Sequence, residues 1–394
     1  VCHDTTGEYS KPPGKAGHPK DGIDLNRVAQ SVGKTSRDTC GACHFYGGGG
    51  NGVKHGDMDD SLAVPERELD VHMDAVGEDF TCATCHRHIE HDIAGSRYTP
   101  TAAHTEDYHI HRKEFSEENN AHCRACHGNR PHKKKDKLRL NHHAKKIACQ
   151  TCHIPKIARG GVATRMTWDW STAGQLDKSG DPLQKRVDGN LVYHGKRGSF
   201  TYAENIEPEY IWFNGEVRYL LLNQVAVPNE DGYVPLNDFG GSADDGRSRI
   251  WPVKIFRGIQ PFDPVMRTLV VPHTTGLNED AYWKNFDWEK AITAGMLSAG
   301  QPFSGKVDFI KTQMSWPINH MVAPAEEAVG CDECHTRGGR LEAIDGIYIP
   351  SRDASQKLDI VGWTVALLTL IGVLLHGLGR FISYLWSQRT CPKE

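Results

Sequence analysis

The clearest hydrophobic pattern lies near the C-terminus of the chain. Twenty residues without Asp, Glu, Lys or Arg run from Ile360 to Gly379, which is long enough to cross a bilayer core as a helix. Basic residues prevail after this stretch, at Arg380, Arg389 and Lys393. This bias favours a single-pass protein of the cytoplasmic membrane with a cytoplasmic C-terminus and the bulk of the chain on the periplasmic side. The alternative is a buried helix of a soluble protein.

The rest of the chain lacks such regular patterning. Residues 1–153 show little helical or alternating periodicity and have loops rich in Gly, His and Lys. Residues 154–350 combine seven tryptophans with many Pro and Gly turns. We therefore predict short α-helices and irregular loops with little β structure, plus one C-terminal transmembrane helix. The predicted parts are an N-terminal domain at 1–153, a loop-rich covering region at 154–350, and an anchor with a short cytoplasmic tail at 351–394.

Composition raises the question of what fills the core. Only 38% of the residues are hydrophobic, and 40 are glycines. A chain this polar struggles to bury enough apolar surface to offset the entropy of ordering its backbone, unless large apolar cofactors supply the core. The formal net charge of -4, from 46 basic and 50 acidic residues, gives no indication of a nucleic-acid partner.

The cysteines identify the cofactor. Ten of the twelve form five CxxC pairs, and a histidine follows each pair directly. CxxCH is the attachment signature of c-type haem: the two thiols bond the porphyrin, and the imidazole becomes the proximal iron ligand. Zinc knuckles, redox-active pairs and disulfides do not require a histidine at that position. The predicted attachment residues are Cys40, Cys43 and His44; Cys82, Cys85 and His86; Cys123, Cys126 and His127; Cys149, Cys152 and His153; and Cys331, Cys334 and His335.

The first residues of the chain resemble the end of a sixth motif. Cys2 and His3 follow Val1 directly, so we expect that the sequence begins inside a longer protein whose first motif is cut. The alternative is an ordinary Cys-His pair. The chain would then carry at least five covalent c haems, or six with the cut motif. Because haem is attached only after export, this cofactor agrees with a periplasmic haem domain.

Histidines outside the motifs can supply second axial ligands. Electron-carrying haems commonly have two strong ligands, and there are more such histidines than haems, so some are bystanders. Sequence alone does not pair them with the motifs. The candidate distal ligands are His55, His72, His91, His122, His132 and His320.

A glycine-rich segment follows the first complete motif. Gly47–Gly50 and Gly52 come shortly after His44, and Lys54 and His55 follow them. Glycines let a backbone pass close to a flat ligand and adopt positive φ without a steric penalty. A flexible surface loop has the same composition, and both interpretations stay open at this point.

Four blocks of the sequence resemble the octahaem tetrathionate reductase family of multihaem c-type cytochromes. This resemblance implies an unusual haem ligated by lysine, with activity toward tetrathionate, nitrite and hydroxylamine. By position, the lysine would be Lys54, opposite His44 on the Cys40/Cys43 haem, and these two residues would be catalytic. The family pattern implies eight haems, whereas this chain has five complete motifs. The blocks are Gly33–Asp57, Ile147–Pro155, Trp168–Gly174 and Trp316–Arg340.

Two functions compete. The first is an oxidoreductase of the tetrathionate or nitrite reductase kind, in which a quinone-linked membrane cytochrome or iron–sulfur subunit, or another multihaem cytochrome, delivers electrons that reduce a small oxyanion. The second is a non-catalytic conduit in which every haem has two histidine ligands. His376, within the apolar stretch, would either ligate a haem of a membrane partner or be a simple interfacial histidine.

Overall fold

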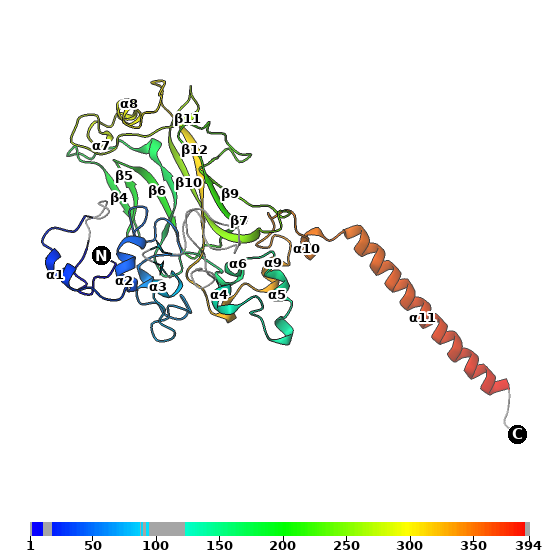
Figure 1. The fold of residues 1–394 in the computed structure, drawn as a ribbon. Helices are drawn as coiled ribbons and strands as arrows, with labels where there is room; N and C mark the ends of the chain where they lie inside the picture. Colours follow the sequence, from blue (N-terminus) through cyan, green and yellow to red (C-terminus); the bar gives the residue numbers. More distant parts are fainter. Residues whose placement is uncertain (1, 11–17, 87, 90–91, 94–122, 391–394) are drawn as a thin grey trace. The chain divides into compact units, whose positions relative to one another are not determined.

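The computed structural model describes residues 2–10, 18–86, 88–89, 92–93 and 123–390 (Figure 1). The chain forms two compact units. The first contains residues 1–330 and 343–346, and the second contains residues 331–342 and 347–394. Each is described by itself below.

Short helices dominate the N-terminal part of the first unit. Between them the described residues form turns and irregular segments, and β1 (His88–Ile89) pairs with β2 (Asp92–Ile93) in antiparallel fashion. This agrees with the weak periodicity of the sequence there. The helices are α1 (Leu25–Gln30), α2 (Arg37–His44), η1 (Asp60–Leu62), α3 (Cys82–Cys85), α4 (Arg124–His127), η3 (Lys135–Lys137), α5 (Leu140–His143) and α6 (Cys149–His153).

A ten-stranded mixed sheet follows in the chain. Its longest strand, β10, pairs with β12 and β7 in antiparallel fashion and with β3 in parallel (Figure 1). The strand order along the main path is β4-β5-β6-β3-β10-β12-β8, while β7 and β11 also pair with β10 and β9 pairs with β7. The strands are β3 (Thr164–Asp169), β4 (Gln184–Val187), β5 (Asn190–His194), β6 (Gly198–Ala203), β7 (Glu209–Tyr219), β8 (Val234–Pro235), β9 (Asn237–Gly240), β10 (Arg249–Asp263), β11 (Thr268–Leu269) and β12 (Asp308–Pro317).

The prediction of little β structure was therefore wrong. All strands of the sheet lie between Thr164 and Pro317, within the region that was predicted to be loop-rich. The segment of β10 contains Pro252 and Pro261. Because proline in the middle of a sequence normally argues against a central strand, the sequence did not indicate a strand there. The strand is nevertheless rich in β-branched and aromatic residues, and Ile250, Trp251 and Val253 are almost fully buried.

The core beneath the sheet also holds one of the motifs in place. Phe213, Phe239, Trp251 and Val253 form a buried cluster with Ala148, which precedes α6. The backbone N–H of Ala148 donates to Ile250 O at 2.9 Å. The fourth CxxCH turn is thus attached to the central strand by packing and by hydrogen bonds.

Further helices complete the first unit. Asp287 Oδ1 accepts the backbone N–H of Lys290 at 3.0 Å and so caps α8, whose Ile292 and Met296 pack against Val270. The remaining helices are η4 (Trp170–Thr172), α7 (Tyr282–Asn285), α8 (Trp288–Ser298) and η5 (Ala325–Glu327).

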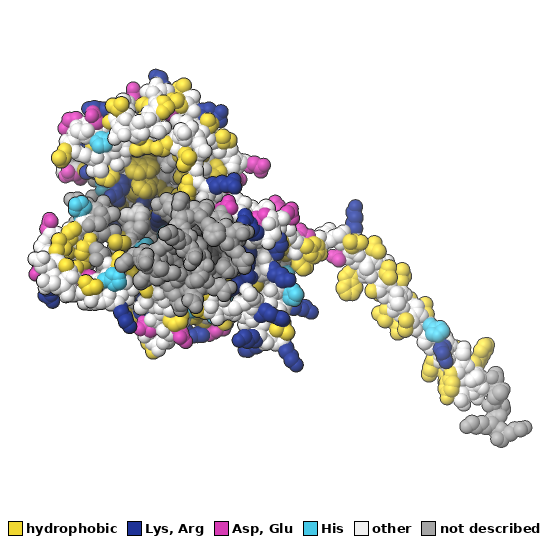
Figure 2. Space-filling view, viewed as in Figure 1, with side chains coloured by type: hydrophobic (Ala, Val, Ile, Leu, Met, Phe, Trp, Pro, Cys, Tyr) yellow, Lys and Arg dark blue, Asp and Glu magenta, His cyan; other side chains and the backbone are white. Residues whose placement is uncertain are grey.

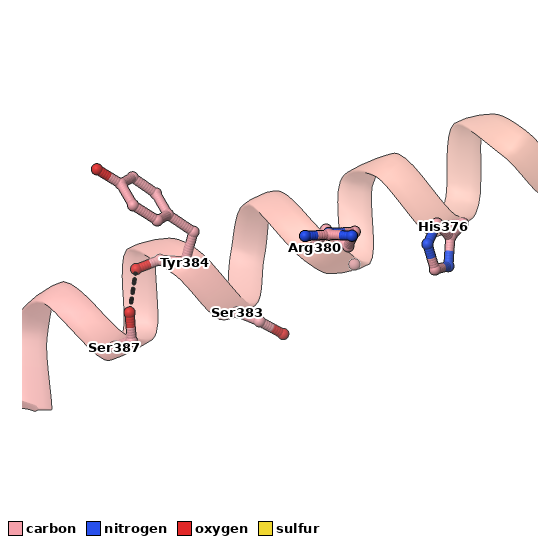
Figure 3. Close-up of a pocket in the computed structure, with 6 residues that line it drawn as sticks. His376, Arg380, Ser383, Tyr384 and Ser387 are labelled. Atoms are coloured by element: carbon pink, nitrogen blue, oxygen red, sulfur yellow. Dashed lines mark hydrogen bonds between the residues drawn. The ribbon is translucent and has the colours of Figure 1, made fainter.

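The second unit carries the last motif and a long helix. It contains α9 (Cys331–Cys334), α10 (Pro350–Asp353) and α11 (Gln356–Thr390). Its helix α11 is long and apolar enough to cross a membrane, and exposed hydrophobic side chains lie along it (Figure 2). His376, Arg380, Ser383, Tyr384 and Ser387 line one face of this helix (Figure 3). The predicted transmembrane helix thus has the required length and surface, whereas its orientation stays a prediction.

Candidate haem-binding sites

Each complete CxxCH motif lies on a short helix or extends one residue beyond it. The helices α2, α3, α6 and α9 contain both cysteines of their motifs, and α4 begins directly after Cys123, which is its N-cap. One helical turn places both thiols on the same side, as attachment to one porphyrin edge requires. Every pair has at least one cysteine with a free thiol, so none of the pairs is a disulfide. These free cysteines are Cys40, Cys43, Cys82, Cys123, Cys126, Cys149 and Cys331.

The sequence explains where the first of these helices begins. Ser36 Oγ accepts the backbone N–H of Thr39 at 3.1 Å, and Thr39 Oγ1 accepts the N–H of Ser36 at 2.9 Å. This reciprocal arrangement satisfies two backbone donors at the start of α2. At the other end of α2, the ring of Phe45 packs against Gly41 and joins a buried cluster with Leu62 and Met321. Cys40, Cys43 and His44 therefore lie on a helix that is fixed at both ends.

Thiols from neighbouring motifs contact each other. A hydrogen bond from Cys82 lowers the pKa of Cys40 to about 6, and the same bond together with burial raises the pKa of Cys82. A hydrogen bond from Cys123 likewise lowers the pKa of Cys149 to about 6. The first motif thus adjoins the second, and the third adjoins the fourth. Cofactors attached there would lie side by side in pairs.

Three motif histidines face a distal histidine at nearly the same separation. The ring centroids of His72 and His127 lie 6.0 Å apart, those of His86 and His320 lie 6.2 Å apart, and those of His132 and His153 lie 6.3 Å apart. Two imidazoles that bind one metal from opposite sides need about 2 Å from each nitrogen to the metal, and hence roughly 6 Å between ring centres. The residues therefore fit an iron held between each pair.

The other predicted ligands have different surroundings. The ring of His55 lies edge-on against Trp316, with centroids 5.1 Å apart. His3 Nδ1 lies 2.9 Å from Gly33 O; because a carbonyl only accepts, the ring donates there and Nε2 is left in the form that binds a metal. His91 and His122 lie outside the described residues. Cys334 and His335 belong to the second unit, and Cys2 is exposed beside His3.

The segment after β12 connects these sites. Asp57 Oδ2 accepts the backbone N–H of His320 at 3.0 Å, and Asp70 Oδ2 accepts that of Val322 at 3.1 Å. The N–H of Ala323 donates to His153 O at 2.9 Å. Burial opposes ionisation of Asp57, but its bond to His320 prevails, and the pKa of Asp57 falls to about 2. Residues 320–323 thus hold Asp57, Asp70 and the fourth motif in fixed relation.

Lys54 lies on the glycine-rich loop that follows α2. A Cβ at Gly48 would approach Lys54 Cβ to 3.3 Å, and Gly48 has φ +81°. Lys54 Nζ lies 4.5 Å from the centroid of the Trp316 ring. Gly56, with φ +77°, lies so close to Thr164 that an added Cβ would be 3.1 Å from its methyl carbon. These glycines let the loop pack closely against the sheet, with Lys54 against Trp316.

A second lysine lies beneath this loop. Lys254 on β10 is 1% exposed, and its register partner on β12 is Trp316. Its Nζ donates to Val53 O at 2.9 Å, Lys54 O at 3.1 Å and Thr164 Oγ1 at 2.5 Å. Burial lowers the pKa of Lys254 to about 7. This side chain therefore fixes the backbone on both sides of the Val53–Lys54 peptide.

The sequence analysis did not identify Lys254, Asp57 or Asp70. A signal for the first was present, since Lys254 is a single charge among Trp251, Val253 and Ile255. A charged residue in an apolar run is either at an edge or paired in the interior. Asp57 and Asp70 carried no local signal, because their partners lie more than 250 residues away in the chain.

Haem content provides a direct test of the attachment sites. Replacing Cys82 and Cys85 together by alanine is expected to lower the covalent haem content by one per chain, because both thioether bonds are lost. Mass spectrometry of the denatured protein measures this. Thr84→Ala, at a position between the two cysteines, is the matched control and should leave the haem content unchanged. An unchanged content in the cysteine variant would rule out this motif as an attachment site.

Comparisons with known proteins agree with this arrangement. Residues 165–338 match the family model described as Cytochrome c bacterial. The fold is similar to the crystal structure of octaheme cytochrome c from Shewanella oneidensis, with a TM-score of 0.74 and 36% sequence identity over 89% of this chain and 75% of that chain. No curated protein sequence matches the chain.

Proposed function

Because this chain belongs to the multihaem c-type cytochrome family that includes the octahaem protein of Shewanella oneidensis, we propose that it is a reductase of small sulfur or nitrogen oxyanions. Its cofactor is covalent haem c, and its general role is electron transfer. In the proposal, His44 and Lys54 hold opposite sides of the haem attached at Cys40 and Cys43. The main support for this proposal is that Lys54 lies on a loop that contacts Trp316 and is hydrogen-bonded to Lys254.

The surroundings of Lys54 suit a ligating amine. Only the neutral amine has a lone pair for a metal, so ligation displaces its proton. Lys54 Nζ lies 4.5 Å from the centroid of the Trp316 ring, and this contact fixes the amine at the surface of the sheet. Lys254 holds the backbone of the same residue through Lys54 O. The loop therefore fixes the position of the amine that the proposal assigns to the metal.

A bound c haem accepts and passes on single electrons and can offer an open or displaceable position to a substrate. Tetrathionate takes two electrons as its central S–S bond breaks, which yields two thiosulfate ions and consumes no proton. The contact between Cys40 and Cys82 puts the second motif beside the proposed catalytic one. The second electron can therefore follow the first over a short distance.

The three pairs of facing histidines favour haems that carry electrons without binding substrate. In the proposal, His72 with His127, His86 with His320, and His132 with His153 are the axial ligands of three haems that only carry electrons. Their ring separations support this role. The same observation also favours the rival function, a conduit in which no haem binds substrate. The two functions differ only at Lys54.

The anchor supports a membrane partner. We propose that α11 spans the cytoplasmic membrane with the haem units on the periplasmic side. A quinol-linked cytochrome or iron–sulfur subunit in the same membrane would then deliver electrons. The polar face of α11, with His376 and Arg380 (Figure 3), would face that partner rather than lipid, because polar groups in spans avoid the hydrocarbon.

Replacing Lys54 by methionine separates the two functions. Wild-type protein reduced with a viologen should be reoxidised by tetrathionate, nitrite or hydroxylamine. The variant should show an altered spectrum for one haem and a turnover that is lower by about tenfold or more, as expected for a ligand change at the reacting metal. Electron paramagnetic resonance and stopped-flow reoxidation measure the two effects.

The matched control is Lys34→Met, since Lys34 is exposed. It should leave both the spectrum and the turnover unchanged. An unchanged spectrum in Lys54→Met would exclude this lysine as a ligand. If none of the three substrates reoxidises the wild-type protein, the conduit function is the correct one.

A further inference from the structure

The three distal histidines differ in what lies behind the ring. His320 Nδ1 lies 3.2 Å from Asp57 Oδ2, within hydrogen-bond distance. His72 Nδ1 lies 3.8 Å from Asp70 Oδ1, which is too far for a hydrogen bond. His132 Nδ1 is buried and has no hydrogen-bond partner among the described residues. Of these three rings, in the part of the chain that the structure describes, only that of His320 is bonded directly to a carboxylate.

Asp57 is held firmly in this position. Its side chain is 2% exposed, and Oδ2 also accepts the backbone N–H groups of Asn319 at 2.7 Å and His320 at 3.0 Å. Because the carboxylate accepts the Nδ1 proton, Nε2 of His320 is left as the metal-binding nitrogen. The carboxylate thus fixes both the tautomer and the orientation of this ring.

A carboxylate that is hydrogen-bonded to a ligating imidazole also changes the reduction potential of the metal. It increases the electron donation of the ring and adds negative charge in a buried place, and both effects favour the more positively charged, oxidised metal. A haem with such a ligand has a lower reduction potential than a haem whose histidine lacks the carboxylate.

We propose that Asp57 sets the potential of the haem held by His86 and His320, and makes it the lowest of the three haems with paired histidines. The inference rests on the proposed axial pairs. This haem adjoins the one beside Lys54, since Cys82 contacts Cys40. Asp57 and Lys54 belong to the same loop, so one segment both places the lysine and tunes the neighbouring donor. Electron transfer from this haem to either of the other two haems with paired histidines is then thermodynamically favoured.

The test is a potentiometric titration of the whole protein, monitored by visible and electron paramagnetic resonance spectra. Asp57→Asn keeps the size of the side chain and removes its charge. The equilibrium constant for reduction of one haem should rise by about tenfold, which raises its midpoint potential by about 59 mV for one electron. Every low-spin haem signal should be retained. Glu66→Gln, which removes an exposed carboxylate from the same part of the chain, is the matched control and should leave this midpoint unchanged.

A set of histidine variants keeps the inference testable even if Asp57→Asn does not assemble. In His320→Met, the haem with the lowest midpoint of the three should change its spectrum, whereas His72→Met and His132→Met should alter haems with higher midpoints. A spectrum that is unchanged in His320→Met would overturn the axial pair itself. If that variant alters a haem with a higher midpoint, or if Asp57→Asn moves no midpoint, the pair stands and the role of Asp57 is overturned.

Discussion

Replacing Lys254 by methionine is expected to destabilise the first unit by about 2–5 kcal/mol and to release the loop that carries Lys54. The methionine side chain has a similar length but no donors. Val53 O and Lys54 O would then be buried without their donor, at about 1–3 kcal/mol each. Chemical unfolding in detergent, followed by circular dichroism, measures the loss. The spectrum of the Cys40/Cys43 haem should change together with it.

Lys311→Met is the matched control, because Lys311 lies exposed on the neighbouring strand β12. It should change the free energy of unfolding by less than about 0.5 kcal/mol. If both variants have wild-type stability, Lys254 does not hold the loop.

The pH dependence of stability provides an independent measurement. The folded-state pKa of Lys254, about 7, is lower than its ordinary value of 10.5. Between these two values the unfolded chain binds more protons than the folded one, so this group makes the free energy of unfolding rise with pH across that window. The Lys254→Met variant should lose this contribution, whereas the Lys311→Met control should keep it.

Ending the chain before Gln356 is expected to move the protein from the membrane fraction to the soluble fraction. The removed segment contains the twenty residues from Ile360 to Gly379 without a charged side chain, and in α11 its apolar side chains are exposed. Without a bilayer around them, these side chains would cause aggregation. Fractionation and haem staining measure the change, and the absorption spectrum should stay as in the full chain.

A matched variant replaces Leu367 and Leu374 by alanine, which shortens side chains but keeps the span apolar; this protein should stay in the membrane. If the truncated chain remains in the membrane fraction, α11 is not the anchor. Recovery of the truncated chain as soluble aggregate, with an altered spectrum, would show instead that α11 covers part of the haem units.

The cofactor could be predicted from the sequence because its signal is local. CxxCH needs only neighbouring residues on one helical turn, and each complete motif lies on a short helix or extends one residue beyond it. The sheet could not be predicted, because its main signal is the pairing of β10 with strands that are far away in the chain. The prolines in β10 also concealed a largely apolar strand in which consecutive residues from Ile250 to Ile255 are buried.

The proposed axial partners depend on long-range contacts in the same way. His320 meets His86 more than 200 residues away, and no spacing rule links the two. Sequence reasoning named His72, His132 and His320 among its candidates together with His55, whose ring lies against Trp316. Lys54 was reached through a family resemblance, whereas Lys254, which holds its loop, became visible only in the folded chain.

The contacts between thiols of different motifs bear on how the protein matures. Cys40 meets Cys82 and Cys123 meets Cys149 in the folded chain, and each of these cysteines is needed for a different haem. In an oxidising compartment, neighbouring thiols close into disulfides, and a bond between motifs would block two attachment sites at once. We therefore expect haem ligation to precede tertiary folding, so that the attachment machinery meets each CxxCH segment while the chain is still extended.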